Sequence, residues 1–282
     1  MLTPVFTFLG IIAVIPVIYL VVTSLTPLTL TNPRSWNFSD PLGNFRLLAG
    51  DLRLRNSLWI QSLLSFFAVT LQLGLGLVAA LLVHARALTG EIIRTALLVP
   101  MVLPPIVVAI VWKILYSPDI SPFWWLFVEL GWTVPAPITD AKLALWAIIL
   151  ADTWEWFPFT MLIILAALKM MPEEWVEAAH VDGATKWQLF RFITLPYLRG
   201  ALLVAGLFRL IDSIKAFPLI YLLTEGGPGH ATEVTNYYTF TQAFGFSYIG
   251  YSSAITLVLI AIVAALSFFI VRTVEGAAKD DD

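Results

Sequence analysis

The chain has 282 residues, of which 59% are hydrophobic and only 12% are charged, whereas a soluble domain has about 45–50% apolar and about 25% charged residues. This composition excludes an ordinary soluble enzyme, and it also excludes a disordered chain. The net charge of −3 argues against a nucleic-acid partner. Cysteine is absent, which removes disulfides, thiolate metal sites and cysteine nucleophiles. The sequence therefore predicts an integral membrane protein surrounded by lipid.

Six stretches of the chain have the roughly 20 apolar residues that a helix needs to cross a bilayer. They cover residues 5–26, 58–83, 95–117, 143–168, 201–223 and 251–272. The first stretch has neither the basic flank nor the cleavage site of a signal peptide, so we expect it to be a retained span. No connection is long enough to form a soluble domain. We expect an all-α, polytopic protein whose residues 1–282 form a single transmembrane domain with about six helices.

The distribution of basic residues favours a cytoplasmic location for both termini, because lysine and arginine concentrate on the cytoplasmic side of a membrane. With this orientation the inner loops and tail contain Arg86, Arg94, Lys169, Lys186, Arg191, Arg199, Arg272 and Lys279, and the outer loops contain Arg34, Arg46, Arg53 and Arg55. The four arginines in the first outer loop argue in the other direction. The larger group nevertheless predicts a multi-pass protein with both termini inside.

The longest polar segment of the expected cytoplasmic side covers residues 172–196 and reads as two short helices. Pro172 suits the first position of a helix, and Glu173 and Glu174 follow at the positive end of its dipole. Gly183 has the freedom to adopt the left-handed conformation that ends a helix. Together these features predict a first helix that stops at residue 182.

The face of this first helix and the start of the second are also readable. Trp175, Ala178, Ala179 and Asp182 share one face, because they follow the i, i+3, i+4, i+7 spacing. Thr185 and Gln188 match a capping box, which predicts a second helix running to Pro196. On this pattern alone, the segment is either a docking element for another protein or an amphipathic helix on the lipid surface.

The spacing of residues 177–196 resembles a known motif. Glu177-Ala178-Ala179 is followed by Gly183 and then by Ile193-Thr194-Leu195-Pro196, which is similar to the EAA loop in the membrane subunits of binding-protein-dependent ABC importers. Further stretches resemble the carbohydrate-uptake branch of that family, the maltose and glycerol-phosphate type. These are Leu97–Pro105, Ala151–Phe159, Phe208–Lys215, Leu223–Gly229 and Gly250–Ala254.

This resemblance implies a type I ABC importer permease in the cytoplasmic (inner) membrane. It implies a second permease subunit in a heterodimer, two cytoplasmic ATPase subunits and an extracytoplasmic solute-binding protein. ATP and magnesium would bind to the partner ATPase, and this chain, which has no phosphate-loop motif, would be no enzyme and would bind no cofactor. The solute would be a sugar, an oligosaccharide, a polyol or a sugar phosphate. The coupling residues would be Glu177, Ala178, Ala179, Asp182, Gly183, Leu195 and Pro196.

Polar side chains inside the apolar spans are candidate functional residues, because burying them is costly. Arg209, Asp212 and Lys215 recur at three-residue intervals in the fifth span, and Asp152 and Glu155 do so in the fourth. The fifth-span residues form either a self-neutralising ladder, with Asp212 between two cations, or part of the translocation path. The fourth-span acids could pair with these cations or line a polar cavity.

Aromatic residues beside these charges suit a sugar ring, whose apolar face stacks while its hydroxyl groups hydrogen-bond. They are also normal membrane anchors. The expected substrate path comprises Asp152, Trp154, Glu155, Trp156, Phe157, Arg209, Asp212, Lys215, Phe217 and Tyr221.

The alternative function is an ion-coupled secondary transporter in which Asp152, Glu155, Arg209 and Asp212 relay an ion or a proton. Such transporters commonly have two related halves, and we find no internal repeat of that kind in this sequence. The three histidines lack metal-ligand spacing, so we expect no metal site, and we expect no catalytic residue.

Overall fold

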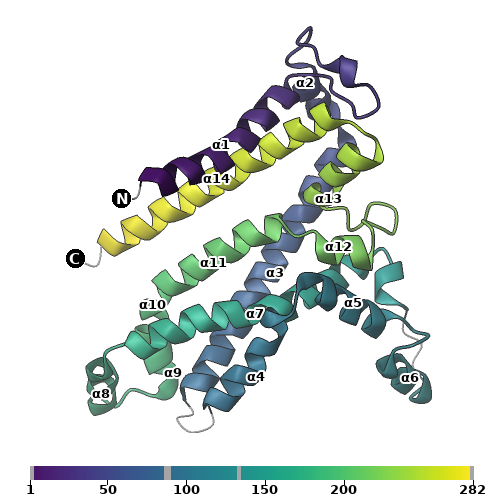
Figure 1. Cartoon of the computed structure of the whole chain (residues 1–282). Coiled ribbons are helices and arrows are strands. Elements are labelled where there is room, and N and C mark those ends of the chain that lie inside the picture. Colours follow the sequence, from purple (N-terminus) through teal and green to yellow (C-terminus); the bar gives the residue numbers. More distant parts are fainter. Residues whose placement is uncertain (1–2, 86–89, 132–134, 280–282) are drawn as a thin grey trace. The chain divides into compact units, whose positions relative to one another are not determined.

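The computed structural model describes residues 3–85, 90–131 and 135–279, and this part of the chain consists of helices and connecting loops without a strand (Figure 1). The all-α prediction is therefore confirmed. Arg86, which contributes to the predicted charge asymmetry, lies outside the described residues. The chain divides into two compact units, residues 1–61 with 233–266 and residues 62–232 with 267–282. Each unit is described by itself.

The first unit combines both ends of the chain. It contains α1 (Thr3–Ser24), η1 (Pro33–Ser35), α2 (Gly43–Gly50), the start of α3 (Leu52–His84), α13 (Thr235–Phe240), the π-helix η4 (Thr241–Gly245) and most of α14 (Ile249–Lys279). Helices α1 and α14 lie side by side (Figure 1), and the Thr23 hydroxyl donates to Ser253 Oγ at 2.8 Å. Gly250 permits a close approach here, because a Cβ at this position would lie 2.0 Å from the carbonyl oxygen of Thr26.

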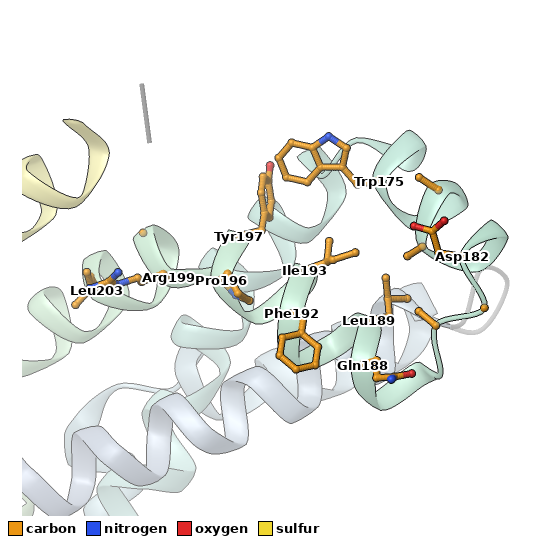
Figure 2. A pocket seen from close by; sticks show the side chains of 15 residues that line it. Trp175, Asp182, Gln188, Leu189, Phe192, Ile193, Pro196, Tyr197, Arg199 and Leu203 are labelled. Carbon is orange, nitrogen blue, oxygen red and sulfur yellow. The ribbon is translucent and has the colours of Figure 1, made fainter. Parts of the chain in front are cut away.

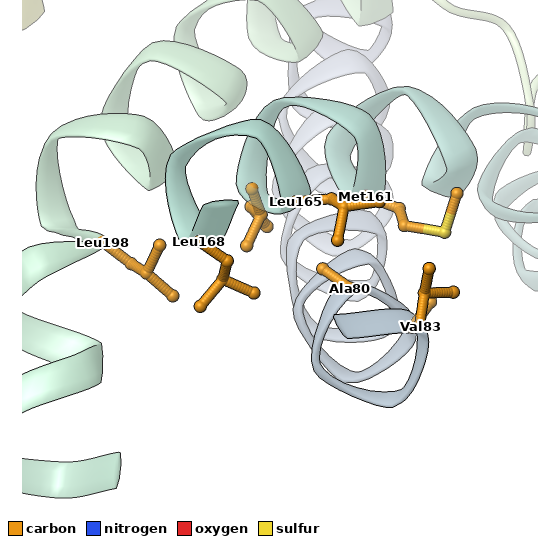
Figure 3. Packing of buried hydrophobic residues seen from close by; sticks show 8 residues of the cluster. Ala80, Val83, Met161, Leu165, Leu168 and Leu198 are labelled. Carbon is orange, nitrogen blue, oxygen red and sulfur yellow. The ribbon is translucent and has the colours of Figure 1, made fainter. Parts of the chain in front are cut away.

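The second unit is built around α7. It contains the rest of α3, then α4 (Gly90–Val102), α5 (Pro105–Tyr116), α6 (Pro122–Glu129), η2 (Pro137–Thr139), α7 (Ala144–Met170), α8 (Glu173–Val181), α9 (Lys186–Leu189), the π-helix η3 (Phe190–Thr194), α10 (Leu195–Tyr197), α11 (Arg199–Ile214) and α12 (Pro218–Leu223). Met161, Leu165 and Leu168 of α7 point towards Ala80 and Val83 of α3 (Figure 3). This buried cluster joins the two helices.

Helices α3 and α7 also approach each other closely at Gly76 and Thr160. A Cβ added to Gly76 of α3 would lie 1.9 Å from Thr160 Oγ1 of α7. The Thr160 hydroxyl also donates to the carbonyl oxygen of Gln72 at 2.6 Å. The absence of a side chain at Gly76 therefore allows α3 and α7 to pack at short range, which fixes the position of Gln72 against α7.

Several predicted spans correspond to helices of the structure. Among the described residues, three helices are long and apolar enough to cross a membrane by length and composition, namely α3, α7 and the Ile249–Phe269 part of α14. Two bent pairs, α4 with α5 and Lys186–Tyr197 with α11, raise this number to as many as five if each pair is one span. The described apolar part of α1, Gly10–Ser24, is a shorter helix.

Two of the predicted spans are not continuous helices. The stretch 95–117 is divided into α4 and α5, which meet at 94°, where Pro104 and Pro105 cannot continue the hydrogen-bond ladder of α4. The stretch 201–223 is divided between α11 and α12, because Pro218 disfavours helical geometry at Phe217, whose φ and ψ are −137° and −50°. Hydropathy alone does not register these breaks, because proline interrupts hydrogen bonds without making a stretch polar.

Candidate functional site

The predicted first helix of the polar segment is α8, and its boundaries differ from the prediction by one residue. Pro172 is the residue before the helix, with extended backbone angles of −60° and 128°, rather than its first residue. Glu173 and Glu174 occupy the first turn, as expected. Their negative charges lie at the positive end of the helix dipole, and this interaction stabilises a helix of only nine residues.

The turn after α8 has the predicted geometry. Gly183 adopts φ +75°, and its N–H donates to the carbonyl oxygen of His180 at 3.1 Å. No atom outside its neighbours lies within 4 Å of the position that a Cβ would occupy, so space would permit a side chain here but the backbone conformation would not. Glycine is therefore required at position 183 by the left-handed backbone conformation of the turn and not by a lack of space for a side chain.

The second helix begins with the predicted capping box. The backbone N–H of Thr185 donates to Gln188 Oε1 at 2.8 Å, and the backbone N–H of Gln188 donates to Thr185 Oγ1 at 3.3 Å. The helical path then continues through α9, η3 and α10, and the N–H of Leu195 donates to the carbonyl oxygen of Phe190. This wider π-helical turn directly precedes Pro196, which cannot donate a hydrogen bond of its own.

A hollow of about 1130 Å³ separates α8 from the helices that follow it. Trp175, Ala178, Ala179 and Asp182 all line it, so the predicted common face exists. Asp182, the residue directly after α8, points into this space opposite Leu189 and Ile193 (Figure 2). Gly183 and Pro196 also line the hollow, whereas Glu177 and Leu195 do not.

An aromatic contact holds the two walls of the hollow together at one end. The rings of Trp175 and Tyr197 meet edge to face, with centroids 5.7 Å apart and an interplanar angle of 89° (Figure 2). Phe192, on the other wall, is 68% exposed. The hollow therefore combines a fixed backbone geometry with apolar surface that the described residues leave uncovered.

The intramembrane charges form a second cluster, within α3, α7 and α11 of the second unit. Arg209 is 2% exposed and donates through Nη1 to Asp212 Oδ2 at 2.5 Å, while its Nη2 lies 3.7 Å from Asp152 Oδ2. Its guanidinium carbon lies 4.5 Å from the centre of the Trp156 ring. The predicted pairing of the fourth-span acids with a fifth-span cation is thus confirmed for Asp152.

Sequence reasoning missed the residue that connects this cluster. Gln72 is fully buried, donates through Nε2 to Asp152 Oδ2 at 2.7 Å and accepts from Arg209 Nε at 2.8 Å. A polar amide in the middle of the apolar stretch 58–83 was the available signal. Gln72 satisfies hydrogen-bonding groups on both charged partners, which lowers the cost of burying them.

The remaining predicted path residues are dispersed around this cluster. Glu155 is 1% exposed, and its Oε1 has no hydrogen-bond partner within the described chain. The rings of Phe217 and Tyr221 stack with centroids 5.4 Å apart. Trp154 contacts Trp112, Phe157 packs against the apolar cluster of Figure 3, and Lys215 is exposed. The structure therefore brings together Asp152, Trp156, Arg209 and Asp212, and Glu155 lies near enough to interact electrostatically with Asp152 and Arg209.

Comparison with known sequences identifies related proteins over most of the chain. The family described as "Binding-protein-dependent transport system inner membrane component" matches residues 72–276. A probable ABC transporter permease protein, y4oQ, of Sinorhizobium fredii is 34% identical over 265 residues, which cover 94% of this chain and 85% of that protein. The trehalose/maltose transport system permease protein MalF of Thermococcus litoralis is 36% identical over 217 residues, which cover 77% of this chain and 72% of that protein.

Comparison with solved structures supports the fold. A chain of a bacterial ABC transporter involved in the import of the acidic polysaccharide alginate superimposes with a TM-score of 0.85 at 19% identity. The superposition covers 98% of this chain and 93% of that chain. The helical arrangement is therefore shared with a transporter chain whose sequence has diverged widely.

Proposed function

The chain belongs to the family of binding-protein-dependent transport system inner membrane components, and we propose that it is the permease through which an ABC importer carries a sugar or oligosaccharide. Its relatives at 30% identity or more include a trehalose/maltose permease and a sulfoquinovosyl glycerol permease, SmoG of Agrobacterium fabrum, 31% identical over 97% of this chain. The polar groups of the α7 and α11 cluster, with the Trp156 ring, are chemically suited to a hydroxylated solute.

In this proposal α8 transmits the work of ATP hydrolysis. Two partner ATPases bind ATP and magnesium, a second, non-identical permease completes the path, and an extracytoplasmic binding protein delivers the solute. The observation that carries the proposal is the hollow beside α8. Its lining beside α8 includes the small residues Ala178, Ala179 and Gly183, so the backbone of a partner can approach α8 closely there.

The local structure of α8 suits such a mechanical role. The turn at Gly183, the capping box at Thr185 and the edge-to-face contact of Trp175 with Tyr197 fix both ends of the helix. Since Glu177 does not line the hollow and is exposed, its carboxylate is available to a basic group at the rim of the ATPase groove. A push on α8 is then passed through η3 and α10 to α11, which contains Arg209 and Asp212.

The proposed path lies along the polar cluster. Glu155 Oε1 is a buried acceptor without a partner in the described chain, and Trp156 presents its ring to Arg209. A solute hydroxyl could donate to Glu155, and a sugar face could replace the guanidinium on Trp156. Because Arg209 retains Asp152, Asp212 and Gln72 as partners, its charge would remain compensated during this exchange.

The association of the ATPase with α8 tests the proposal. In the complete complex, Glu177→Lys reverses a charge beside the hollow, and we expect ATPase affinity to fall about tenfold, which corresponds to about 1.4 kcal/mol. Glu177→Gln is the matched control, because it removes the charge without reversing it and leaves the first turn of α8 unchanged. Co-purification and solute-stimulated hydrolysis in proteoliposomes are the measurements. Equal behaviour of both variants and the unchanged complex would favour a helix that lies on the lipid surface instead.

A further inference from the structure

The first unit contains a pocket that the proposed function does not use. It has a volume of about 700 Å³ and lies among the loop after α1, α2, η4 and the start of α14. Small-molecule sites commonly measure about 300–1,000 Å³ and combine aromatic walls with a few polar groups. Its lining includes Asn44, Asp51, Tyr238, Gln242, Tyr248 and Tyr251. Size and lining together are those of a small-molecule site with aromatic walls.

One wall of the pocket is held rigidly by Asp51. The hydroxyl groups of Tyr238 and Tyr251 both donate to Asp51 Oδ2, and the backbone N–H groups of Arg53 and Leu54 donate to Oδ1 at 2.8 and 3.0 Å. Burial raises the pKa of Asp51, but these hydrogen bonds outweigh it and leave the pKa below its usual value. The carboxylate therefore orients two tyrosine rings at neutral pH.

Two amide groups of the lining are left without partners. Gln242 is only 7% exposed, and no hydrogen bond within the described residues engages its side-chain amide. Asn44 donates through Nδ2 to the carbonyl oxygens of Ser24 and Thr26 at 2.8 and 2.9 Å, which leaves its Oδ1 without a partner in the same part of the chain. The Gln242 amide lines the pocket, so it can both donate to and accept from a ligand held there.

The backbone around Gln242 is also irregular. Gln242 lies in the π-helix η4, and π-helical turns occur frequently at functional sites. Ser247, just before Tyr248, adopts φ +67°, which is uncommon for a residue other than glycine. Both features set the directions of pocket residues, Gln242 in the first case and Tyr248 in the second.

The charges of the lining select against an ionic ligand. Arg46 is the basic residue of the lining, and it forms an ion pair with Asp40. Asp51 is negative and already accepts four hydrogen bonds. Asp51 would repel an anion, and a cation would compete with the two tyrosines for Asp51 Oδ2. An amide both donates and accepts, as a hydroxyl group does, so the lining suits a neutral polyhydroxylated ring.

We propose that this pocket is a second, extracytoplasmic subsite that binds one neutral sugar ring of the solute, with Gln242 as its hydrogen-bonding anchor and tyrosines as its walls. The inference rests on the proposed function for the class of solute and for the six-span topology. In that topology the loop after α1 and the loop before α14 are both extracytoplasmic.

Protection of a single cysteine from labelling tests the subsite. The chain has no cysteine of its own, so Leu47→Cys, in the lining and 64% exposed, reports on the pocket in the complete transporter in sugar-free lipid nanodiscs. Leu42→Cys is the matched control, because Leu42 is 60% exposed and outside the lining. With a dissociation constant of about 1 mM, trehalose or maltose at about 10 mM should slow maleimide labelling of Leu47→Cys about tenfold. Labelling of Leu42→Cys should not change.

A second substitution attributes the protection to the anchor. Gln242→Met keeps the length of the side chain but removes both hydrogen-bonding groups, so protection of Leu47→Cys should be lost in the double variant. Labelling that neither sugar slows, or that both sugars slow equally at Leu42→Cys, would overturn the subsite. So would protection that persists with Gln242→Met, or that requires a glycolipid in the nanodisc.

Sugar uptake in proteoliposomes separates this inference from the proposed function. Uptake of trehalose or maltose without protection overturns the subsite and leaves the proposed function intact. Protection that depends on Gln242, in a complex that takes up neither sugar, supports the subsite and refutes the proposed transport for these two sugars. The two conclusions therefore fail in distinguishable ways.

Discussion

Replacement of Gly183 by valine is the sharpest test of the coupling role of α8. Gly183 has φ +75°, and a residue with a Cβ pays about 1–2 kcal/mol in this region, with a β-branched residue among the worst cases. Because the position of a Cβ is free of contacts within 4 Å, the cost comes from the backbone and not from a clash. A difference of about 1–2 kcal/mol changes a population about 5–30-fold.

We expect this change to reduce solute-stimulated ATP hydrolysis by a similar factor, about 5–30-fold. The reason is that the turn sets the direction in which the chain leaves α8, and a relaxed turn moves α8 relative to η3 and α11. The permease itself should still insert, because such a cost is small compared with the burial of α7 in the second unit. Stimulated hydrolysis and uptake in proteoliposomes, each normalised to the inserted permease, are the measurements.

Two further variants test whether the backbone conformation at Gly183 causes the loss of hydrolysis. Gly131 also has φ +75° with no atom within 4 Å of a Cβ position, so Gly131→Val imposes the same strain away from α8 and should leave hydrolysis unchanged. Gly183→Asn should retain most activity, because asparagine tolerates the left-handed region. Equal losses in Gly183→Asn and Gly183→Val, or equal losses in Gly131→Val and Gly183→Val, would refute the reasoning.

Three further predictions concern stability and topology. Arg209→Met leaves Asp152 buried without its cation and should destabilise the permease by about 3–5 kcal/mol, measured by thermal unfolding. The double variant with Asp152→Asn should recover part of this loss, and a double variant that recovers none of it would contradict the ion pair. The pKa of Asp51 is lower in the folded protein than in the unfolded one. The ionised Asp51 therefore stabilises the folded state above about pH 4, and this contribution is lost as the pH falls through the folded pKa. Asp51→Asn should reduce the acid sensitivity of unfolding, and an unchanged pH profile would argue against this linkage. In intact cells, Ser35→Cys and His230→Cys should react with an impermeant thiol reagent, whereas labelling of Lys186→Cys would reverse the predicted orientation.

The features that were predicted correctly depend on residues close together in the chain. Gly183 and the Thr185–Gln188 capping box were predictable because a left-handed turn and an i, i+3 hydrogen bond involve only a few adjacent residues. The pairing of Arg209 with Asp212 follows from helical spacing in the same way. The membrane class needed even less, because composition alone separates a lipid-exposed chain from a soluble one.

The features that required the structure depend on residues far apart in the chain. Gln72 meets Arg209 across 137 positions, and Asp51 meets Tyr238 and Tyr251 across 187 and 200 positions. No local propensity records which distant helices pack together, so the amide that bridges the buried charges could be noticed in the sequence but not assigned a partner. Composition and local spacing determined a helical membrane protein with a short, sharply ended docking helix. Packing of distant helices decided where its buried polar groups meet, because hydrogen-bond partners are chosen by proximity in space and not by order in the chain.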